Sequence, residues 1–198
     1  MEETDFVKNA WDTCLELVSD RGYNVTSNYH QLTENDLIHM MNNNTEIICI
    51  NSDGTKKICI KFVVVTRPKP SYLKELVEEI RKEIKDVELE IIFVLRARPN
   101  NSILKITKEF HNLQLMWIKQ LQFNPTKHEQ VPKHERLSSE EGMELLKKYD
   151  LASKQQLPIL LRDDVIARYY NYKAGDIIKI TNTASSHNKN YVFYRCVR

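Results

Sequence analysis

Cysteine is the residue type in this sequence best suited to bind a soft metal or to act as a nucleophile. The four cysteines lie far apart, each inside an apolar segment, at Cys14, Cys49, Cys59 and Cys196. A structural zinc site needs at least one pair of closely spaced ligands, such as C-x-x-C, and the sequence has none. The pattern therefore predicts small buried thiols in a reducing compartment, and no metal site.

Hydrolytic and nucleotide-dependent chemistry is also poorly supported. The sequence has no Gly-x-Ser-x-Gly nucleophile elbow, and its six histidines lie in polar stretches. The four glycines are too widely spaced to form a loop that holds phosphates. We therefore expect no cofactor and no small-molecule substrate.

The charge balance limits the partners. Among 198 residues, 29 are Lys or Arg and 27 are Asp or Glu, so the net charge is +2. This near-balance excludes a histone-like binder, which needs a large positive excess, but it allows a local basic patch. No apolar run approaches the ~20 residues of a membrane-spanning helix, and the acidic start over 1–5 does not resemble a secretory signal. We expect no membrane partner.

Hydrophobic periodicity predicts a mixed α/β arrangement for the first part of the chain. Apolar residues at three- and four-residue steps indicate helices, and β-branched runs indicate strands. Asp53-Gly54 is typical of a hairpin turn. The expected elements are helices over 6–18 and 32–41, hairpin strands over 46–50 and 57–65, a helix over 71–84, a strand over 87–95, a helix over 102–110 and a strand over 113–118.

A polar segment that begins near residue 124 and carries two prolines predicts a linker. We therefore expect an N-terminal α/β domain over 1–125, with a sheet that is largely parallel after the hairpin, and a small α+β C-terminal domain over 126–198. The elements expected in the second domain are a helix over 139–149 with a capping box from Ser138 and Glu141, a helical turn over 165–170 capped by Asp163 or Asp164, and strands over 176–180 and 191–197.

Several motifs occur in a fixed order. The segment 157–170 reads L-P-I-L-L-R-D-D-V-I-A-R-Y-Y, followed by K-A-G-D-I-I-K-I at 173–180 and Y-V-F-Y-R at 191–195. Upstream lie H-E-Q-V-P-K-H at 128–134, E-L-L-K-K-Y at 144–149 and L-V-S-D-R-G-Y-N-V at 17–25. Together they resemble the fifth-largest subunit of eukaryotic DNA-directed RNA polymerases. In that family, the corresponding archaeal protein consists of the C-terminal domain alone.

The resemblance implies a non-catalytic subunit that assembles with other polymerase subunits. Its C-terminal domain would dock on the largest subunit, and the Mg²⁺-dependent nucleotidyl transfer would belong to other chains. Asp164 and Arg168 have a local alternative, an ion pair that only holds the short helix. The residues expected at the interface are Pro158, Asp164, Ala167, Arg168, Tyr169, Gly175, Tyr194 and Arg195.

The resemblance also implies that the N-terminal domain forms part of a jaw that contacts downstream DNA weakly. A loop between a strand and a helix carries donors that could meet phosphates, although a solvated loop would look the same. These DNA-proximal candidates are Arg96, Arg98, Asn100, Asn101 and Lys105.

Four features depart from the family pattern, two of them being Ala174, which stands where the family usually has Arg, and the polar loop expected over 181–190, which lacks the usual Pro and Gly. Val165 stands where the family has Pro, and Asn171 stands where it usually has Gly; Asn keeps a left-handed turn possible. These departures and the Asn-, Ile- and Lys-rich composition suggest a divergent member, such as a viral homologue. A cellular protein would be located in the nucleus, and one from a large DNA virus in the host cytoplasm and the virion.

The predicted order of elements in the N-terminal domain is also similar to that of restriction-endonuclease-like nucleases. Those enzymes hold Mg²⁺ with an Asp near a strand start and an acid-x-Lys motif on the next strand. Asp53 and Lys61 are loosely placed for these roles, but Cys59 occupies the position of the second acid, and a thiol is a poor Mg²⁺ ligand. The alternative to a polymerase subunit is thus a free-standing nucleic-acid-binding or nuclease-derived protein.

Overall fold

The computed structural model describes residues 3–84, 88–182 and 191–198. The chain divides into two compact units, Met1–Phe123 and Asn124–Arg198. That each unit folds on its own as a domain, with the boundary at 125–126, stays a prediction. No helix in the described part of the chain combines the length and apolarity that crossing a bilayer requires.

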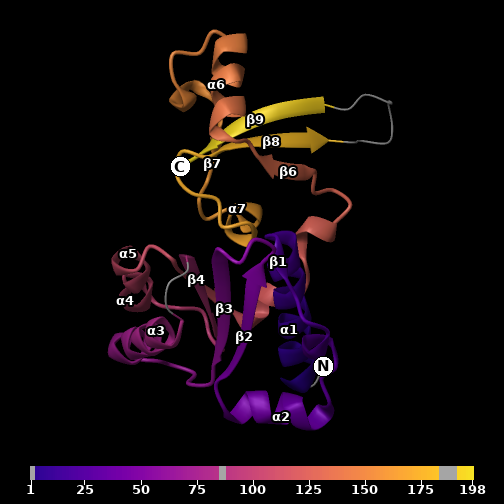
Figure 1. Cartoon of the computed structure of the whole chain (residues 1–198), viewed down its shortest axis with the longest axis vertical. Coiled ribbons are helices and arrows are strands. Elements are labelled where there is room, and N and C mark those ends of the chain that lie inside the picture. Colours follow the sequence, from indigo (N-terminus) through magenta and orange to yellow (C-terminus); the bar gives the residue numbers. More distant parts are fainter. Residues whose placement is uncertain (1–2, 85–87, 183–190) are drawn as a thin grey trace. The chain divides into compact units, whose positions relative to one another are not determined.

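The N-terminal unit alternates helices and strands around one sheet (Figure 1). Its helices and strands are α1 (Glu3–Asp20), β1 (Tyr23–Asn24), α2 (Glu34–Asn42), β2 (Thr45–Asn51), β3 (Lys56–Val63), α3 (Pro70–Glu83), β4 (Glu88–Leu95), α4 (Asn101–Leu104), α5 (Ile106–Glu109) and β5 (Leu113–Trp117). Short 3₁₀ turns are formed by η1 (Ser27–His30) and η2 (Ile118–Leu121).

The five strands lie in the order β1-β2-β3-β4-β5. β2 and β3 form the predicted antiparallel hairpin, and β3, β4 and β5 are parallel, as expected. Because each parallel connection moves one strand further in the same direction, right-handed crossovers place both connections on one face of the sheet. Figure 1 shows α3, α4 and α5 together on that face and α1 on the other.

Both faces of the sheet are buried by helices. On the α3 face, Cys59, Ile91 and Phe93 pack with Leu73 and Ile103 in one apolar cluster. On the α1 face, the ring of Trp11 lies 5.6 Å from that of Phe62. The central strand β4 is therefore apolar on both faces, which explains its near-continuous run of hydrophobic residues.

All four cysteines are free and buried, which confirms the prediction of buried thiols. Burial raises the pKa of Cys14 and of Cys59 to about 12, and that of Cys49 to about 11. The thiolate, which is the nucleophilic form, is therefore suppressed at these three positions near neutral pH.

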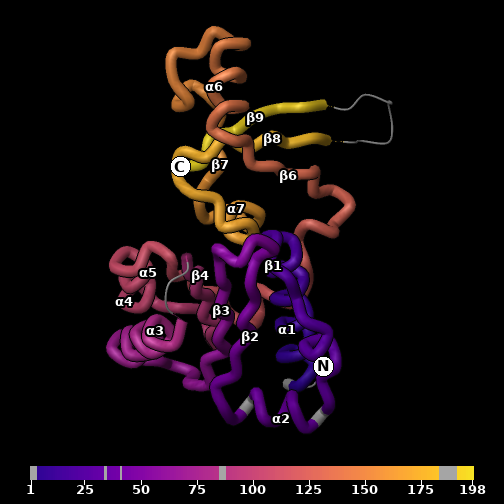
Figure 2. The backbone as a smooth tube through the Cα atoms, in the orientation of Figure 1, coloured from indigo at the N-terminus to yellow at the C-terminus, as the bar shows by residue number. Residues whose placement is uncertain are grey.

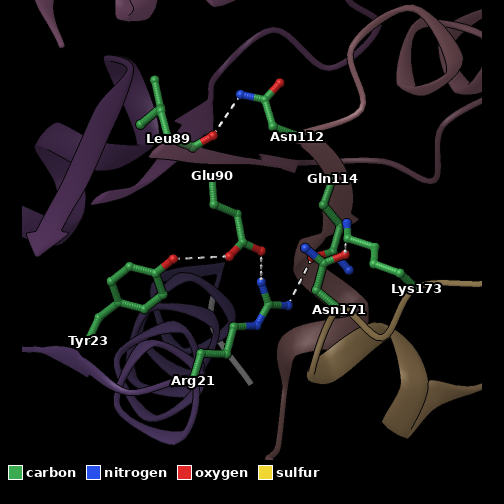
Figure 3. A network of polar contacts seen from close by, with 8 residues as sticks. All are labelled: Arg21, Tyr23, Leu89, Glu90, Asn112, Gln114, Asn171 and Lys173. Atoms are coloured by element: carbon green, nitrogen blue, oxygen red, sulfur yellow. Dashed lines mark hydrogen bonds and ion pairs between the residues drawn. The ribbon is translucent and has the colours of Figure 1, made fainter. Parts of the chain in front are cut away.

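One polar network connects α1 to the sheet (Figure 3). The guanidinium of Arg21 forms an ion pair with Glu90 on β4 and donates from Nη2 to Gln114 Oε1 on β5 at 2.9 Å. Tyr23 donates its hydroxyl to the other oxygen of Glu90 at 3.4 Å. Burial, with the Glu90 carboxylate beside it, raises the pKa of Tyr23 to about 12. Gly22, at φ +85, provides the turn that lets Arg21 and Tyr23 converge on Glu90.

The C-terminal unit has a second, smaller sheet (Figure 2). Its elements are η3 (Pro125–Lys127), β6 (Lys133–Arg136), α6 (Ser139–Lys148), η4 (Lys154–Gln156), β7 (Ile159–Leu160), α7 (Val165–Tyr169), β8 (Ile177–Asn182) and β9 (Tyr191–Val197). The strand order is β6-β8-β9-β7, with β7 parallel to β9 and the other pairs antiparallel.

Each face of this sheet has its own apolar cluster. Leu145 of α6 packs with Ile177 and Cys196 on one face. Ala167 of α7 packs with Ile178 and Val197 on the other. The predicted capping box of Ser138 and Glu141 is present at the start of α6, which confirms that helix boundary.

Several elements differ from the sequence-based expectations, among them the short strands β1 and β7, which were not expected. The helix expected over 102–110 is two short helices, α4 and α5, which meet at Lys105. Strand β6 was not predicted, because Lys-His-Glu-Arg has no apolar alternation and becomes a strand only by pairing with β8. The part of the expected 181–190 loop that the structure describes, residues 181–182, still belongs to β8, and the remainder lies outside the described residues.

Replacing Arg21 tests the importance of the buried network. Arg21→Ala leaves the Glu90 charge without its cation at a site where the two side chains are only 5% and 18% exposed. We expect the N-terminal unit to lose about 3 kcal/mol of unfolding free energy. The measurement is urea unfolding followed by tryptophan fluorescence, since both tryptophans, Trp11 and Trp117, lie in this unit.

The matched control is Lys56→Ala. The Lys56–Glu88 ion pair is on the surface, with side chains 50% and 73% exposed, and should contribute about 0–1 kcal/mol. Equal losses from the two variants would contradict a special role for the network.

Candidate interaction surfaces

The predicted DNA-proximal residues follow β4 at the carboxyl edge of the N-terminal sheet. Arg96 comes directly after β4, and Arg98 extends over Trp117, with its guanidinium carbon 5.8 Å from the ring centroid. Asn100 caps α4, because its Oδ1 accepts from the Ile103 amide at 3.0 Å. The loop is thus anchored by Asn100 while Arg98 remains exposed.

Asn101 and Lys105 are also exposed, the first at the start of α4 and the second between α4 and α5. The five predicted residues therefore lie together in one loop-helix segment. The side-chain oxygen of Asn100 has a structural role, because it caps the start of α4.

The structure adds a residue to this edge that the sequence analysis missed. Lys119 follows β5, and Leu95 pairs with Trp117 in the parallel register, so Arg96 and Lys119 reach the same edge. A half-open pocket of about 180 Å³ lies there, lined by Phe6, Val7, Arg96, Ile118 and Lys119. No sequence signal pointed to Lys119, because its proximity to Arg96 arises from strand pairing.

The segments that follow the three parallel strands carry charge of one sign. Residues 64–69, 96–105 and 118–123 contain no Asp or Glu, although acids and bases are nearly balanced in the whole chain. The six cations in these segments are Arg67, Lys69, Arg96, Arg98, Lys105 and Lys119. We call this set the basic edge. A concentration of cations at one sheet edge raises the local potential well above what a net charge of +2 suggests.

In the C-terminal unit, α7 and its N-cap residue hold four of the predicted interface residues. Asp164 caps the helix: one of its oxygens, Oδ1, accepts from the amides of Ile166 at 2.9 Å and Ala167 at 3.3 Å. Ala167 and Tyr169 are buried, and Arg168 is half-buried. Asp164 is exposed, so the outer surface of this turn is polar at its start.

The other four predicted residues lie around β9. Pro158 accepts the Cys196 amide on its carbonyl at 2.8 Å, and Arg195 donates to the Ile159 carbonyl at 2.8 Å. Gly175 has φ +89, and its carbonyl accepts from Lys154 Nζ at 2.8 Å. Tyr194 packs against the α6 face, with its ring 6.2 Å from that of Tyr149. The eight residues therefore belong to both faces of the sheet rather than to one patch.

Two exposed apolar side chains lie beside Asp164. Leu161 is 66% exposed and Val165 is 53% exposed. They are joined by a turn in which the Asp164 amide donates to the Leu161 carbonyl at 3.0 Å. We call Leu161, Asp164, Val165 and Arg168 the α7 surface. The sequence contains one indication of this exposed surface, the three consecutive apolar residues Ile159, Leu160 and Leu161. A two-residue strand cannot bury all three of these side chains.

The residues considered for a nuclease site do not assemble into one. Asp53 lies in the exposed turn between β2 and β3, whereas Cys59 is buried under α3. Lys61 forms an ion pair with Glu46 across the hairpin at 3.2 Å. Within the described ranges, no three His, Cys, Asp or Glu side chains lie close enough together to hold a metal ion.

Comparison with known proteins places the chain in a family. Residues 123–197 match the family described as RNA polymerase Rpb5, C-terminal domain. The chain is also 30% identical over 190 residues to DNA-directed RNA polymerase V subunit 5A of Arabidopsis thaliana, covering 92% of this chain and 84% of that protein. The chain belongs to the Rpb5 family of RNA polymerase subunits, which are accessory rather than catalytic components of the enzyme.

Two further relatives show the extent of the similarity. The subunit rpabc1 of DNA-directed RNA polymerases I, II and III of Dictyostelium discoideum is 26% identical over 204 residues, covering 100% of both chains. DNA-directed RNA polymerase subunit Rpo5 of Archaeoglobus fulgidus is 46% identical over 77 residues, which are 39% of this chain and 99% of the archaeal one. The similarity thus covers both units in the eukaryotic relatives and a stretch about as long as the C-terminal unit in the archaeal relative.

Substitutions at Asn171 test how much stability the chain loses when the residue at this family glycine position changes. Asn171 adopts a left-handed conformation with φ +54, as predicted. Asn171→Gly should be nearly neutral, whereas Asn171→Ala should cost about 1 kcal/mol because a Cβ without a compensating polar group disfavours this conformation.

Both variants remove the 2.8 Å hydrogen bond from Lys173 Nζ to Asn171 Oδ1, so their difference isolates the backbone preference. Native-state hydrogen exchange at the amides of β8, which lies between β6 and β9, reports the unfolding free energy of this unit. Equal stability of the two variants would show that the backbone conformation is not limiting.

Proposed function

We propose that this chain is the subunit-5 component of a multisubunit DNA-directed RNA polymerase and that its C-terminal unit docks on the largest subunit. The observation that carries the proposal is the α7 surface. Leu161 and Val165 expose apolar side chains beside Asp164 and Arg168, on a segment inside the region that matches the Rpb5 family. Exposed apolar groups with charged neighbours are typical of the centre and rim of a protein interface.

The archaeal relative supports assigning the assembly role to this unit. Almost the whole of that polymerase subunit is covered by a 77-residue match, and the C-terminal unit spans residues 124–198. A subunit of this length must contain its own docking surface. The buried residues Ala167 and Tyr169 would then support the α7 surface from inside, whereas Asp164 and Arg168 would contact the partner directly.

For the N-terminal unit, we infer a jaw-type position beside downstream DNA. The basic edge carries six cations and no acid, which suits contact with phosphates. The sheet order and the parallel β3-β4-β5 core agree with a restriction-endonuclease-like arrangement, without the carboxylate pair of a nuclease. With few phosphate contacts, the unit would guide DNA weakly.

The location of the protein follows from the polymerase it serves. A cellular chain would act in the nucleus, and a chain from a large DNA virus would act in the host cytoplasm and be packaged in the virion. Tagging the chain in its native cell and identifying the co-purifying large subunits tests the class and the polymerase together. Elution as a free ~23 kDa chain would contradict the subunit assignment.

Charge introduced on the α7 surface should weaken assembly. Leu161→Glu combined with Val165→Glu places two carboxylates where an apolar partner surface is expected. We expect incorporation into polymerase to fall at least about ten-fold, as for a central interface residue. The measurement is the ratio of tagged variant to largest subunit after purification.

Met143→Glu is the control, because Met143 is a 56% exposed apolar residue on α6, outside the α7 surface. It should leave incorporation unchanged. A similar loss in both variants would point to general instability, and no loss in either would remove the α7 surface from the interface.

Removing cations from the basic edge should reduce the salt dependence of DNA retention. We expect Arg96→Ala with Arg98→Ala and Lys105→Ala to lower the slope of log affinity against log salt by about 0.9 for each phosphate that the variant no longer neutralises. The measurement is dissociation of downstream duplex from the assembled polymerase over a salt series.

The control changes the net charge equally at exposed lysines elsewhere: Lys8→Ala, Lys82→Ala and Lys147→Ala. Identical slopes for the two triple variants would mean that the effect is general charge, and that the basic edge does not meet DNA.

A further inference from the structure

The strand β9 has an edge that its neighbours cover only in part. On one side, the whole of β8 pairs with residues Tyr191–Cys196 of β9. On the other side, β7 pairs only with Cys196 and Val197. Within the described residues, no strand lies beside Tyr191–Arg195 on the β7 side.

The hydrogen bonds of the covered part show which groups face this edge. The amides of Cys196 and Arg198 donate toward β7, to the carbonyls of Pro158 at 2.8 Å and Leu160 at 3.0 Å. The Val197 amide donates to the opposite side, to the Asp176 carbonyl at 2.9 Å. Because strand residues alternate and the register has no bulge, the amides and carbonyls of Val192 and Tyr194 also point toward the β7 side.

Two other sheet edges in the described part of the chain are protected. The outer strand of the same sheet, β6, consists of Lys133, His134, Glu135 and Arg136, and charged side chains discourage pairing with another strand. The edge of β2 is covered by Tyr29, whose hydroxyl contacts both the amide and the carbonyl of Ile48, at 3.2 and 3.3 Å. Over Tyr191–Tyr194 the β9 edge carries no charged side chain, and among the described residues no side chain caps its backbone as Tyr29 caps Ile48.

The β9 edge instead carries exposed apolar side chains. Tyr191, Val192 and Phe193 are 57%, 44% and 39% exposed. Alternation places Tyr191, Phe193 and Arg195 on the α7 face and Val192 and Tyr194 on the α6 face. An added strand would therefore find apolar neighbours on both faces.

Cations lie at the Arg195 end of this edge on both faces. The Arg195 guanidinium lies 5.8 Å from the centroid of the Phe193 ring on one face. On the other, Lys148 Nζ lies 5.7 Å from the Tyr149 ring, which itself packs 6.2 Å from Tyr194. Residues 191–198 include two arginines and no acid. An acidic side chain on the added strand would complement this end.

We propose that β9 accepts an extended segment of another polymerase subunit as an additional strand. This strand would lie beside Tyr191–Arg195, on the same side of β9 as β7. The segment is about five residues long, has apolar side chains on both faces and carries an Asp or Glu beside Arg195. This inference rests on the proposed assembly into polymerase and adds a second contact, distinct from the α7 surface.

Hydrogen exchange tests the strand directly. The full chain is compared alone and within the polymerase with which it co-purifies, using overlapping peptides across 191–195. The Val192 and Tyr194 amides should exchange quickly in the free chain and at least about ten-fold more slowly in the complex. Unchanged exchange in the complex would overturn the added strand while leaving the proposed function intact. Slow exchange already in the free chain would overturn it too, because the edge would be covered without a partner subunit.

A proline substitution removes the donor that the added strand needs. Val192→Pro deletes an amide that faces the β7 side and therefore keeps the pairing with β8. We expect it to lower incorporation into polymerase about ten-fold relative to Val192→Thr, which keeps the amide and the branched shape. Equal incorporation of the two variants, with wild-type-like circular dichroism in both, would overturn the proposal. Failure of the wild-type chain to co-purify with polymerase would instead refute the proposed function itself.

Discussion

The ion pair between Arg21 and Glu90 fixes the position of α1 on the N-terminal sheet. A buried charge is stabilised only when its partner is held in place, and here Gln114 and Tyr23 complete the set (Figure 3). Gly22 must separate Arg21 from Tyr23 because the chain reverses there from helix to strand. Arg21, Gly22 and Tyr23 therefore each have a role in folding, and the basic edge depends on the sheet that this network holds.

The sequence predicted the elements whose burial follows a regular period. Helices α1 and α3 and strands β3, β4 and β5 were found because their apolar residues repeat at helical or strand spacing. β6 was missed because its side chains are polar and its pairing with β8 is a tertiary property. The break between α4 and α5 was missed as well, because both halves have helix-forming residues and only the structure shows the interruption at Lys105.

The candidate surfaces were predictable to a similar degree. The loop that carries Arg96 and Arg98 could be found because its residues are consecutive, whereas Lys119 joins them only through the register of β4 and β5. For α7, family motifs pointed to the segment as a whole but could not separate Asp164, which is exposed, from Ala167 and Tyr169, which are buried. Motif matching finds residues that matter and does not distinguish those that contact a partner from those that support the contact.

The strand order of the C-terminal unit also determines when the unit can fold during its synthesis. β9 comes after the other three strands along the chain, yet it lies between β8 and β7. A nascent chain that lacks residues 191–197 therefore has no strand to join β7 to the rest of the sheet, and the cluster around Leu160 and Ile178 is without Val197. The unit can complete its fold only after β9 has left the ribosome, so premature termination shortly before β9 should produce a chain with a folded N-terminal unit and an exposed, aggregation-prone C-terminal segment.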